Sequence, residues 1–227
     1  GFFSLASTWG EYADESIFLN KRDFREGYDF DEIVIPALKN ALRNSAKRKV
    51  IFVHLMGSHP DYKQRYPSKY KIWDAASVVP DGVLRKYLGE FFAEKFNSYD
   101  NSIAYTDHIL SEVINLAATF RVDSVTYFSD HGQNLGEKTS IVGHSVDSGP
   151  RQGFEVPLFF WINKPHDPNM LGSIGVFAKN LEKPYSLDRI QYSLFDLFQI
   201  SYPKQSSDRS LFSDKYSVVT RACDRLQ

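Results

Sequence analysis

The pair Asp130 and His131 places a carboxylate beside an imidazole at the end of an apolar run, 125–128, and a glycine-rich loop follows it. Carboxylate and neutral imidazole are the usual protein ligands of zinc-like divalent ions in hydrolytic sites. Adjacent side chains of an extended strand point to opposite faces, but at a strand end the chain turns and both can converge on one ion. A turn with a solvated acid would have the same residues, and the spacing alone leaves both interpretations open.

Further histidines lie in or after expected strands. His59 ends the loop that follows a different strand, and His144 lies in the loop beyond His131. Loops that follow strands are where α/β proteins place ligand-binding groups, so both residues are candidates for the same site. His54 lies inside an apolar run, where a histidine is more often packed in the core than bound to a ligand.

Hydrophobic periodicity predicts alternating strands and helices as the scaffold for these residues. Short continuous apolar runs predict strands covered on both faces, and apolar residues spaced three and four apart predict helices. This alternation favours an α/β fold with a mainly parallel sheet flanked by helices, in which ligands bind beyond the carboxyl ends of the strands. The predicted strands are 2–6, 50–56, 124–129 and 156–162, and the predicted helices are 31–48, about 84–120 and 186–200.

Composition and charge limit the possible classes of function. A chain of 227 residues can form one α/β domain, and a net charge of -1 gives no electrostatic case for nucleic acid or an anionic membrane surface. The single cysteine excludes an internal disulfide. No apolar run approaches the ~20 residues of a membrane span, and no signal peptide is recognisable. The chain starts directly in an apolar segment, which we interpret as a boundary within a longer protein.

Several longer segments, taken in order, match the motifs of a known enzyme family. The segment 129–138 reads SDHGQNLGEK, 54–67 reads HLMGSHPDYKQRYP, 99–107 reads YDNSIAYTD, and a Val-Pro strand start lies within 155–158. In this order they resemble the alkaline phosphatase superfamily, and specifically its sulfatase-like phosphoethanolamine transferase branch. The branch has S-D-H-G at a strand end, and it also has a G-S-H loop that continues into Y-x-x-R-Y-P. The matching segments cover most of residues 28–165.

The resemblance implies a metal site and a substrate site. Asp130 and His131 resemble two ligands of a catalytic zinc. His59 and His144 resemble catalytic histidines that contact the phosphoryl group or a second metal ion, and Gln133 would join them in binding substrate. Gln133 stands where many relatives have glutamate. Its side chain is a neutral amide, which cannot act as a base. The loop residues that either line the cleft or are simply solvated are Tyr62, Lys63 and Arg65.

The resemblance also implies a reaction and a location. Members of the branch pass phosphoethanolamine from phosphatidylethanolamine to lipopolysaccharide, at lipid A or the core, or to a related envelope glycan, through a threonine nucleophile. Neither that nucleophile motif nor a further acidic ligand nor a membrane anchor is recognisable here. We therefore expect residues 1–227 to be the C-terminal part of an alkaline phosphatase-like catalytic domain. The whole protein would be anchored in a bacterial inner membrane and face the periplasm, and this chain alone would turn over poorly.

The sequence leaves two further interpretations open. One is a sulfatase or a phosphoglycerol transferase of the same superfamily, although the loop that joins G-S-H to Y-x-x-R-Y-P favours phosphoethanolamine transfer. A Cys-x-Pro-x-Arg motif upstream would indicate a sulfatase instead. The second is a non-catalytic binding module or an inactive fragment, which would take up little or no zinc.

Overall fold

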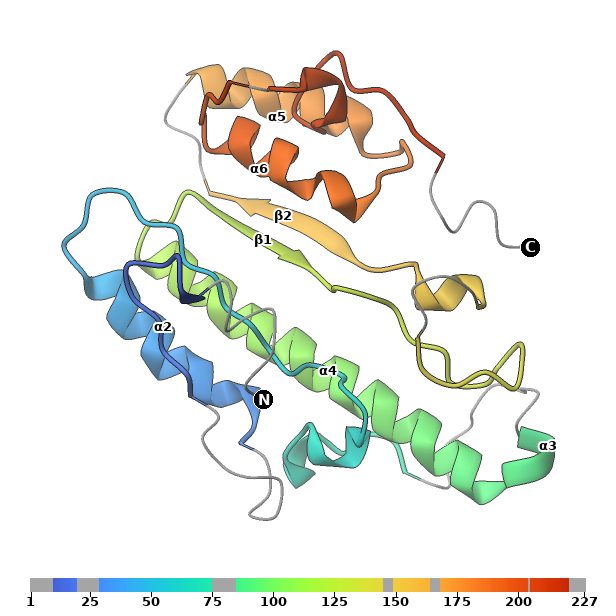
Figure 1. Cartoon of the computed structure of the whole chain (residues 1–227). Coiled ribbons are helices and arrows are strands. Elements are labelled where there is room, and N and C mark those ends of the chain that lie inside the picture. Colours follow the sequence, from blue (N-terminus) through green and yellow to red (C-terminus); the bar gives the residue numbers. More distant parts are fainter. Residues whose placement is uncertain are drawn as a thin grey trace. The chain divides into compact units, whose positions relative to one another are not determined.

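In the computed structural model the chain forms two compact units. Unit 1 comprises 1–122 and 134–143, and unit 2 comprises 123–133 and 144–227. The strand predicted at 2–6 lies outside the described residues. Among the helices that are described, none has both the length and the apolar character needed to cross a membrane. The described residues are 10–19, 29–74, 85–144, 149–163, 168–203 and 205–220 (Figure 1).

Unit 1 is built on the long helix α4, Glu90–Thr119, which confirms the helix predicted over about 84–120. The short helix α3, Arg85–Leu88, precedes it, and Gly89 separates the two with a φ of 50°. Glycine adopts this left-handed φ without the steric cost that a Cβ would add. The core of unit 1 is formed by Val34, Tyr66, Tyr105 and Ile109.

Helix α2, Val34–Arg43, contacts α4 within unit 1 and is shorter than the helix predicted from the sequence. The 3-10 helix η1, Asp31–Ile33, comes directly before it. The chain leaves the helix at Asn44, where ψ is 142°. Lys49 then turns back, and its Nζ donates to the carbonyl of Leu42 at 2.7 Å. A cation at this end compensates the carbonyls that have no partner within the helix.

The apolar run 50–56 forms no strand in the part of the chain that the structure describes, so the strand predicted there is wrong. A strand needs a neighbour that accepts from its N–H groups and donates to its carbonyls, and apolar composition does not provide one. Phe52 is 79% exposed, and His54 is also exposed. The interpretation of His54 as a packed core residue is therefore wrong as well.

Unit 2 contains a pair of strands, β1, Ser124–Phe128, and β2, Leu158–Ile162. They run antiparallel, with Thr126 opposite Phe160 (Figure 1). The predicted sheet was mainly parallel, and this pair differs from that direction. A parallel pair needs a crossover, usually a helix, whereas the described part of the β1–β2 connection contains only the short 3-10 helix η4, Arg151–Gly153.

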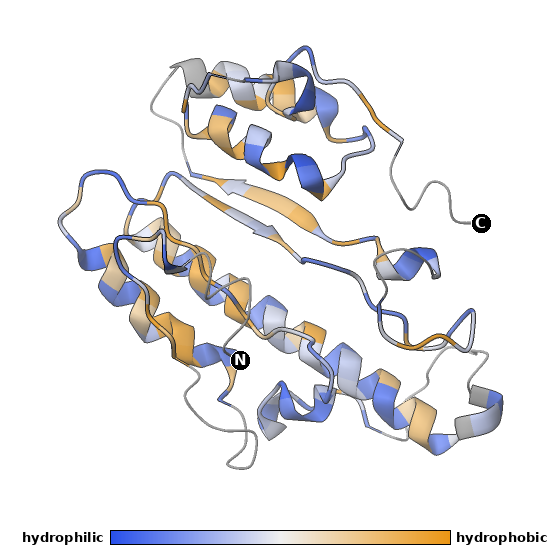
Figure 2. Cartoon of the chain, in the orientation of Figure 1, coloured by the Kyte–Doolittle hydropathy of each residue, from blue (hydrophilic) through white to orange (hydrophobic). Residues whose placement is uncertain are grey.

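Helices α5, Pro168–Asn180, and α6, Ile190–Leu197, lie on one side of the strand pair (Figure 1). β2 is apolar along its length (Figure 2), and Phe160 on it makes an edge-to-face contact with Phe177 of α5 at 5.2 Å between ring centroids. The sequence pattern predicts α6 within 186–200 but does not predict α5. Gly172 and Gly175 lower the helix propensity of α5, and packing against β2 overrides it.

Candidate active site

The chain turns sharply where β1 ends, and this turn determines how Asp130 and His131 are presented. The hydroxyl of Ser129 donates to the carbonyl of His131 at 2.9 Å, and the backbone N–H of His131 donates to Oδ1 of Asp130 at 3.0 Å. These two contacts close a tight turn immediately after the strand. The side chains of neighbouring residues, which would diverge on a strand, are thereby directed to the same side.

The ring of His131 has its proton position defined by a backbone carbonyl. Nδ1 lies 2.8 Å from the carbonyl oxygen of Gly132. A carbonyl only accepts hydrogen bonds, so Nδ1 holds the proton and Nε2 keeps a lone pair. Nε2 lies 3.8 Å from Oδ2 of Asp130. Two ligands of one tetrahedral zinc stand roughly 3.3–3.5 Å apart, given bond lengths near 2.0–2.1 Å.

The donor chemistry of Asp130 and His131 therefore fits a divalent metal ion. A histidine that binds metal usually donates its other ring N–H to a carbonyl or carboxylate, and His131 already makes that contact with Gly132. In the described part of the chain no three or more His, Cys, Asp or Glu side chains converge as a metal-holding group. The arrangement thus supplies two donors within the described residues.

Gly132 tolerates no side chain, because the chain packs tightly against it. Its N–H donates to the carbonyl of Gly153 in η4 at 3.0 Å. A Cβ at this position would lie 2.0 Å from the carbonyl oxygen of Gln152 and 2.8 Å from that of Glu155. The glycine in the D-H-G motif is therefore required by this close approach, which also fixes the carbonyl that orients His131.

His144 stacks on His131, with ring centroids 3.5 Å apart and an angle of 21° between the planes. The two residues flank a loop whose ends are held together by Asn134 and Gly143. The N–H of Asn134 donates to Gly143 at 2.9 Å, and the N–H of Gly143 donates back at 2.8 Å. The ring contact and the proximity of Asp130 to His131 show that three of the predicted site residues, Asp130, His131 and His144, lie together in unit 2.

Gln133, predicted to bind substrate, follows Gly132 directly and is half-buried. His59, predicted to be catalytic, belongs to unit 1.

His59 lies in a loop that a buried carboxylate holds in place. Asp31, 8% exposed, accepts hydrogen bonds from the backbone N–H groups of Met56 at 3.0 Å and Gly57 at 2.8 Å. Gly57 has a φ of 51°, and the N–H of His59 donates to the carbonyl of Met56 at 3.2 Å. The sequence did not indicate Asp31 as a site residue, because an acid at a helix start is a common capping feature.

Arg65 clamps the same loop from its other end. The side chain is buried, with 5% exposure, and its Nε donates to the carbonyls of His59 at 3.2 Å and Pro60 at 3.3 Å. Its Nη2 donates to Pro60 at 2.9 Å and lies 3.4 Å from Nδ1 of His59. Tyr62 is also buried, whereas Lys63 is exposed and pairs with Glu94. Of the loop residues left open by the sequence, only Lys63 is a solvated one.

Helix α4 contacts two segments of unit 1 through polar side chains of the YDNS segment: Asn101 bonds the backbone at residues 72–73, and Ser102 reaches the His59 loop. Oδ1 of Asn101 accepts from the N–H groups of Ile72 at 2.8 Å and Trp73 at 3.0 Å, and its Nδ2 donates to the carbonyl of Trp73 at 2.7 Å. The hydroxyl of Ser102 lies 2.8 Å from that of Ser58. The resemblance of this segment to a family motif thus has a structural explanation, since Asn101 holds the backbone of residues 72–73 and Ser102 bonds the side chain of Ser58.

Asp100, on α4 in unit 1, has a raised pKa. Burial on α4 raises the pKa of Asp100 above its ordinary value, and the negative charge of Glu137 raises it further. Oε2 of Glu137 accepts from the N–H of Leu135 at 2.9 Å, which holds the glutamate in its loop. The ionised form of Asp100 is therefore disfavoured in the folded chain.

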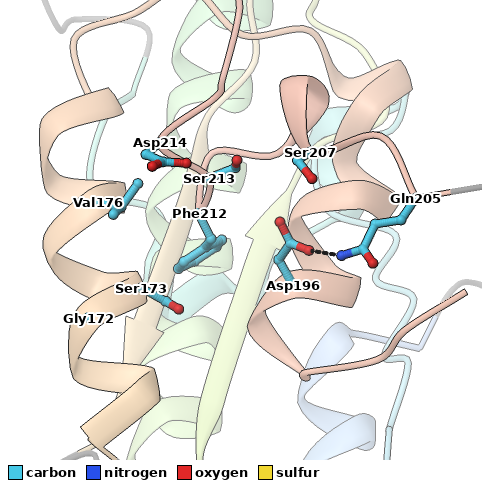
Figure 3. Close-up of a pocket in the computed structure, with 9 residues that line it drawn as sticks. All are labelled: Gly172, Ser173, Val176, Asp196, Gln205, Ser207, Phe212, Ser213 and Asp214. Atoms are coloured by element: carbon cyan, nitrogen blue, oxygen red, sulfur yellow. Dashed lines mark hydrogen bonds between the residues drawn. The ribbon is translucent and has the colours of Figure 1, made fainter.

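A separate pocket of about 520 Å³ lies in unit 2 (Figure 3). Its lining includes Asp196 and Gln205, and Nε2 of Gln205 donates to Oδ1 of Asp196 at 3.0 Å. None of the residues predicted to be functional lines it. The remaining lining residues are Gly172, Ser173, Val176, Ser207, Phe212, Ser213 and Asp214.

The strand pair with helices packed on it, and the acid and imidazole at the end of β1, define an α/β domain with a candidate metal site. The chain belongs to the sulfatase family, whose match covers residues 2–200. Over 96% of its length it is 26% identical to phosphoethanolamine transferase EptC of Escherichia coli strain K12. Over 73% of its length it is 28% identical to the Kdo(2)-lipid A phosphoethanolamine 7''-transferase of the same strain. The chain spans 37% of the first relative and 28% of the second.

Solved structures show the same fold. The C-terminal periplasmic domain of EcEptC from Escherichia coli, in complex with Zn, superposes with a TM-score of 0.83 at 24% identity, and covers 96% of this chain and 60% of that one. The corresponding domain of EptC from Campylobacter jejuni superposes with a TM-score of 0.68 at 27% identity, over 85% of this chain and 60% of that one. The resemblance predicted from the motifs and the alkaline phosphatase-like fold are both confirmed.

Proposed function

We propose that this chain forms the metal-binding part of a phosphoethanolamine transferase. The enzyme would transfer phosphoethanolamine from phosphatidylethanolamine to lipopolysaccharide, at lipid A or the core, or to a related envelope glycan. The observation that supports this most directly is the 3.8 Å separation between Nε2 of His131 and Oδ2 of Asp130 at the end of β1. The names of the relatives, which are phosphoethanolamine transferases, support the choice of transferred group.

Asp130 and His131 would hold a zinc ion in this proposal. When bound, the ion supplies Lewis acidity, which stabilises charge on phosphoryl oxygens. The carbonyl of Gly132 keeps the proton of His131 on Nδ1, so that Nε2 can face the ion without prior proton loss. Asp130 keeps Oδ2 for the ion while Oδ1 accepts from the backbone. Each ligand is thus oriented by a contact that leaves one donor atom available.

The remaining site residues would act on the phosphoryl group. His144, stacked on His131, presents an exposed ring beside the two ligands and would contact phosphoryl oxygens or a second metal ion. His59 would donate to phosphoryl oxygens or protonate a leaving alkoxide. Gln133 would bind substrate through its amide and could not act as a base. The nucleophile would be a threonine from a segment upstream of the matching motifs.

The proposed setting is a partial catalytic domain, residues 1–227, that faces the periplasm on a bacterial inner membrane. Solved domains with this fold are periplasmic, which supports the location. Phosphatidylethanolamine is a membrane lipid, so the donor would be met at the membrane surface.

Zinc binding by purified chain tests the proposal. We expect Asp130→Ala to weaken zinc affinity by at least ~10-fold, because it removes one of the two donors that face each other. Asp123→Ala is the matched control, since Asp123 is an exposed acid at the opposite end of β1, and it should leave affinity unchanged. Equal zinc content in wild-type chain and the Asp130 variant, measured by mass spectrometry of metals, would remove Asp130 as a ligand.

The family match also allows a second function, the hydrolysis of sulfate esters. Transfer of phosphoglycerol, and binding without catalysis, are two more functions that a chain with these motifs could have. The longer protein, supplied with fluorescent phosphatidylethanolamine and with an aryl sulfate, would separate them. Transfer of the lipid headgroup without release of sulfate is the result that our proposal requires.

A further inference from the structure

We propose that Arg65 is a positioning residue that holds His59 as the neutral Nε2–H tautomer. His59 would then act as a hydrogen-bond donor toward an anionic phosphoryl oxygen and not as a ligand of a second metal ion. The donor role rests on the proposed function, but the tautomer follows from unit 1 alone. This separates two roles for His59 that the family resemblance leaves open.

The proton position follows from the chemistry of the two side chains. A guanidinium has only N–H donors, and Nη2 of Arg65 lies 3.4 Å from Nδ1 of His59. For this contact to be attractive, Nδ1 must present its lone pair. In a neutral imidazole the proton is then on Nε2, which is the edge of the ring turned away from Arg65.

Other hydrogen bonds of Arg65 hold its guanidinium beside the ring of His59. Nη2 of Arg65 is anchored at the carbonyl of Pro60 by the 2.9 Å hydrogen bond, and Nε contacts the carbonyls of both His59 and Pro60. With 5% exposure, the guanidinium cannot leave without losing these bonds in a buried setting. Asp31 holds the start of the same loop through two backbone N–H groups. The hydrogen bonds to the loop backbone therefore fix the position of the Arg65 guanidinium relative to the His59 ring.

His131 provides the opposite case within the same chain. Its Nδ1 faces the carbonyl of Gly132 and must donate, so its Nε2 has a lone pair. For His59 to bind a metal ion through Nε2, its proton would have to move to Nδ1. Two N–H groups, one from each residue, would then point at one another in place of the present contact. The surroundings therefore suit Nε2 of His131 to metal binding and Nε2 of His59 to donating a hydrogen bond.

Nuclear magnetic resonance of the 227-residue chain with ¹⁵N-labelled histidine tests the inference directly. In a neutral ring the unprotonated nitrogen resonates far downfield of the protonated one, and couplings to the ring protons tell Nδ1 from Nε2. We expect the unprotonated nitrogen to be Nδ1 in His59 and Nε2 in His131. The signals of His59 are assigned by their loss in His59→Gln. A His59 ring protonated at Nδ1 in wild-type chain would overturn the inference.

Variants show whether Arg65 is the cause. Arg65→Lys retains a charge but loses the planar fork, and we expect it to give His59 a mixture of both tautomers while circular dichroism stays unchanged. Lys63→Gln is the matched control, because Lys63 is a nearby exposed cation, and it should leave the tautomer unchanged. A single Nε2–H tautomer in folded Arg65→Lys would show that Arg65 is not the cause. If Arg65→Lys does not fold, the wild-type spectrum still decides the tautomer.

Zinc titration separates this inference from the proposed function. Added zinc should shift the Nε2 resonance of His131 and leave both ring nitrogens of His59 in place. A zinc-dependent shift of Nε2 in His59 would overturn its role as a donor. No shift at His131 would contradict the proposed metal site, while the tautomer of His59 would stand.

Discussion

Nη2 of Arg65 lies 3.4 Å from Nδ1 of His59, and the same nitrogen donates to the carbonyl of Pro60 at 2.9 Å. One buried guanidinium thus binds both the backbone and the ring of the loop that presents His59. The contact couples the shape of the loop to the proton position of the ring. A change in either one would alter what His59 can offer to a substrate.

Gly132→Ala should destabilise the chain by about 1–3 kcal/mol, because the new methyl group would clash with the carbonyl oxygens of Gln152 and Glu155. Urea denaturation would measure the change in the free energy of unfolding. Gly172→Ala is the control, since nothing lies within 4 Å of its Cβ position in α5, and it should stabilise by about 0.5–1 kcal/mol. Equal behaviour of the two variants would contradict the close approach at Gly132.

Asp31→Asn should cost about 1–3 kcal/mol of stability, because an amide N–H₂ would replace one of two oxygens that accept buried backbone N–H groups. Hydrogen exchange should quicken at the amides of Met56 and Gly57. Glu32→Gln is the neighbouring control, and as an exposed position it should change stability by less than about 0.5 kcal/mol. Unchanged exchange at the two amides in Asp31→Asn would refute the clamp.

Asp100→Asn should stabilise the chain at neutral pH and lose this advantage in acid. Burial and the charge of Glu137 raise the pKa of Asp100 in the folded chain, so the folded state holds this proton more tightly than the unfolded state does. The contribution of Asp100 to stability is therefore fully present below the unfolded pKa of about 3.8, and it is lost as pH rises through the higher folded value. Thermal melts of wild type and Asp100→Asn across pH would reveal this difference.

Asp107→Asn, an exposed position on the same helix, is the control, and it should change stability at neutral pH by less than about 0.5 kcal/mol. Glu137→Gln should bring the pKa of Asp100 part of the way back, since burial is the larger cause and remains. Carboxyl ¹³C titration would follow Asp100 directly. A pKa of Asp100 that does not move in Glu137→Gln would remove the glutamate as a cause.

The isolated chain should hydrolyse phosphodiesters poorly even with zinc present. Catalytic zinc sites usually have three protein ligands, and Asp130 and His131 provide two in the described part of the chain. Release of nitrophenol from bis(p-nitrophenyl) phosphate would measure turnover. Rapid zinc-dependent turnover that disappears in His131→Ala would show that these residues suffice for the reaction.

Local sequence patterns predicted the long helix, the strand before Asp130 and the family, because each depends on residues close together in the chain. The apolar spacing across 103–117 predicted a long helix between about 84 and 120, and α4 confirms it. The apolar run before Asp130 and His131 predicted that a strand would present them, and β1 confirms it. The motif order predicted the family, which the match over residues 2–200 confirms.

The sequence by itself therefore determined the family, the long helix and the pairing of an acid with an imidazole at a strand end, because each follows from short-range order. Tertiary structure decided the antiparallel direction of β2, the existence of α5 and the lack of a partner strand for 50–56 among the described residues. It also decided the proton positions on His131 and His59. Those depend on which group meets Nδ1, a carbonyl in one case and a guanidinium in the other. The carbonyl of Gly132 is placed by its close packing against residues 152–155, which lie far along the chain.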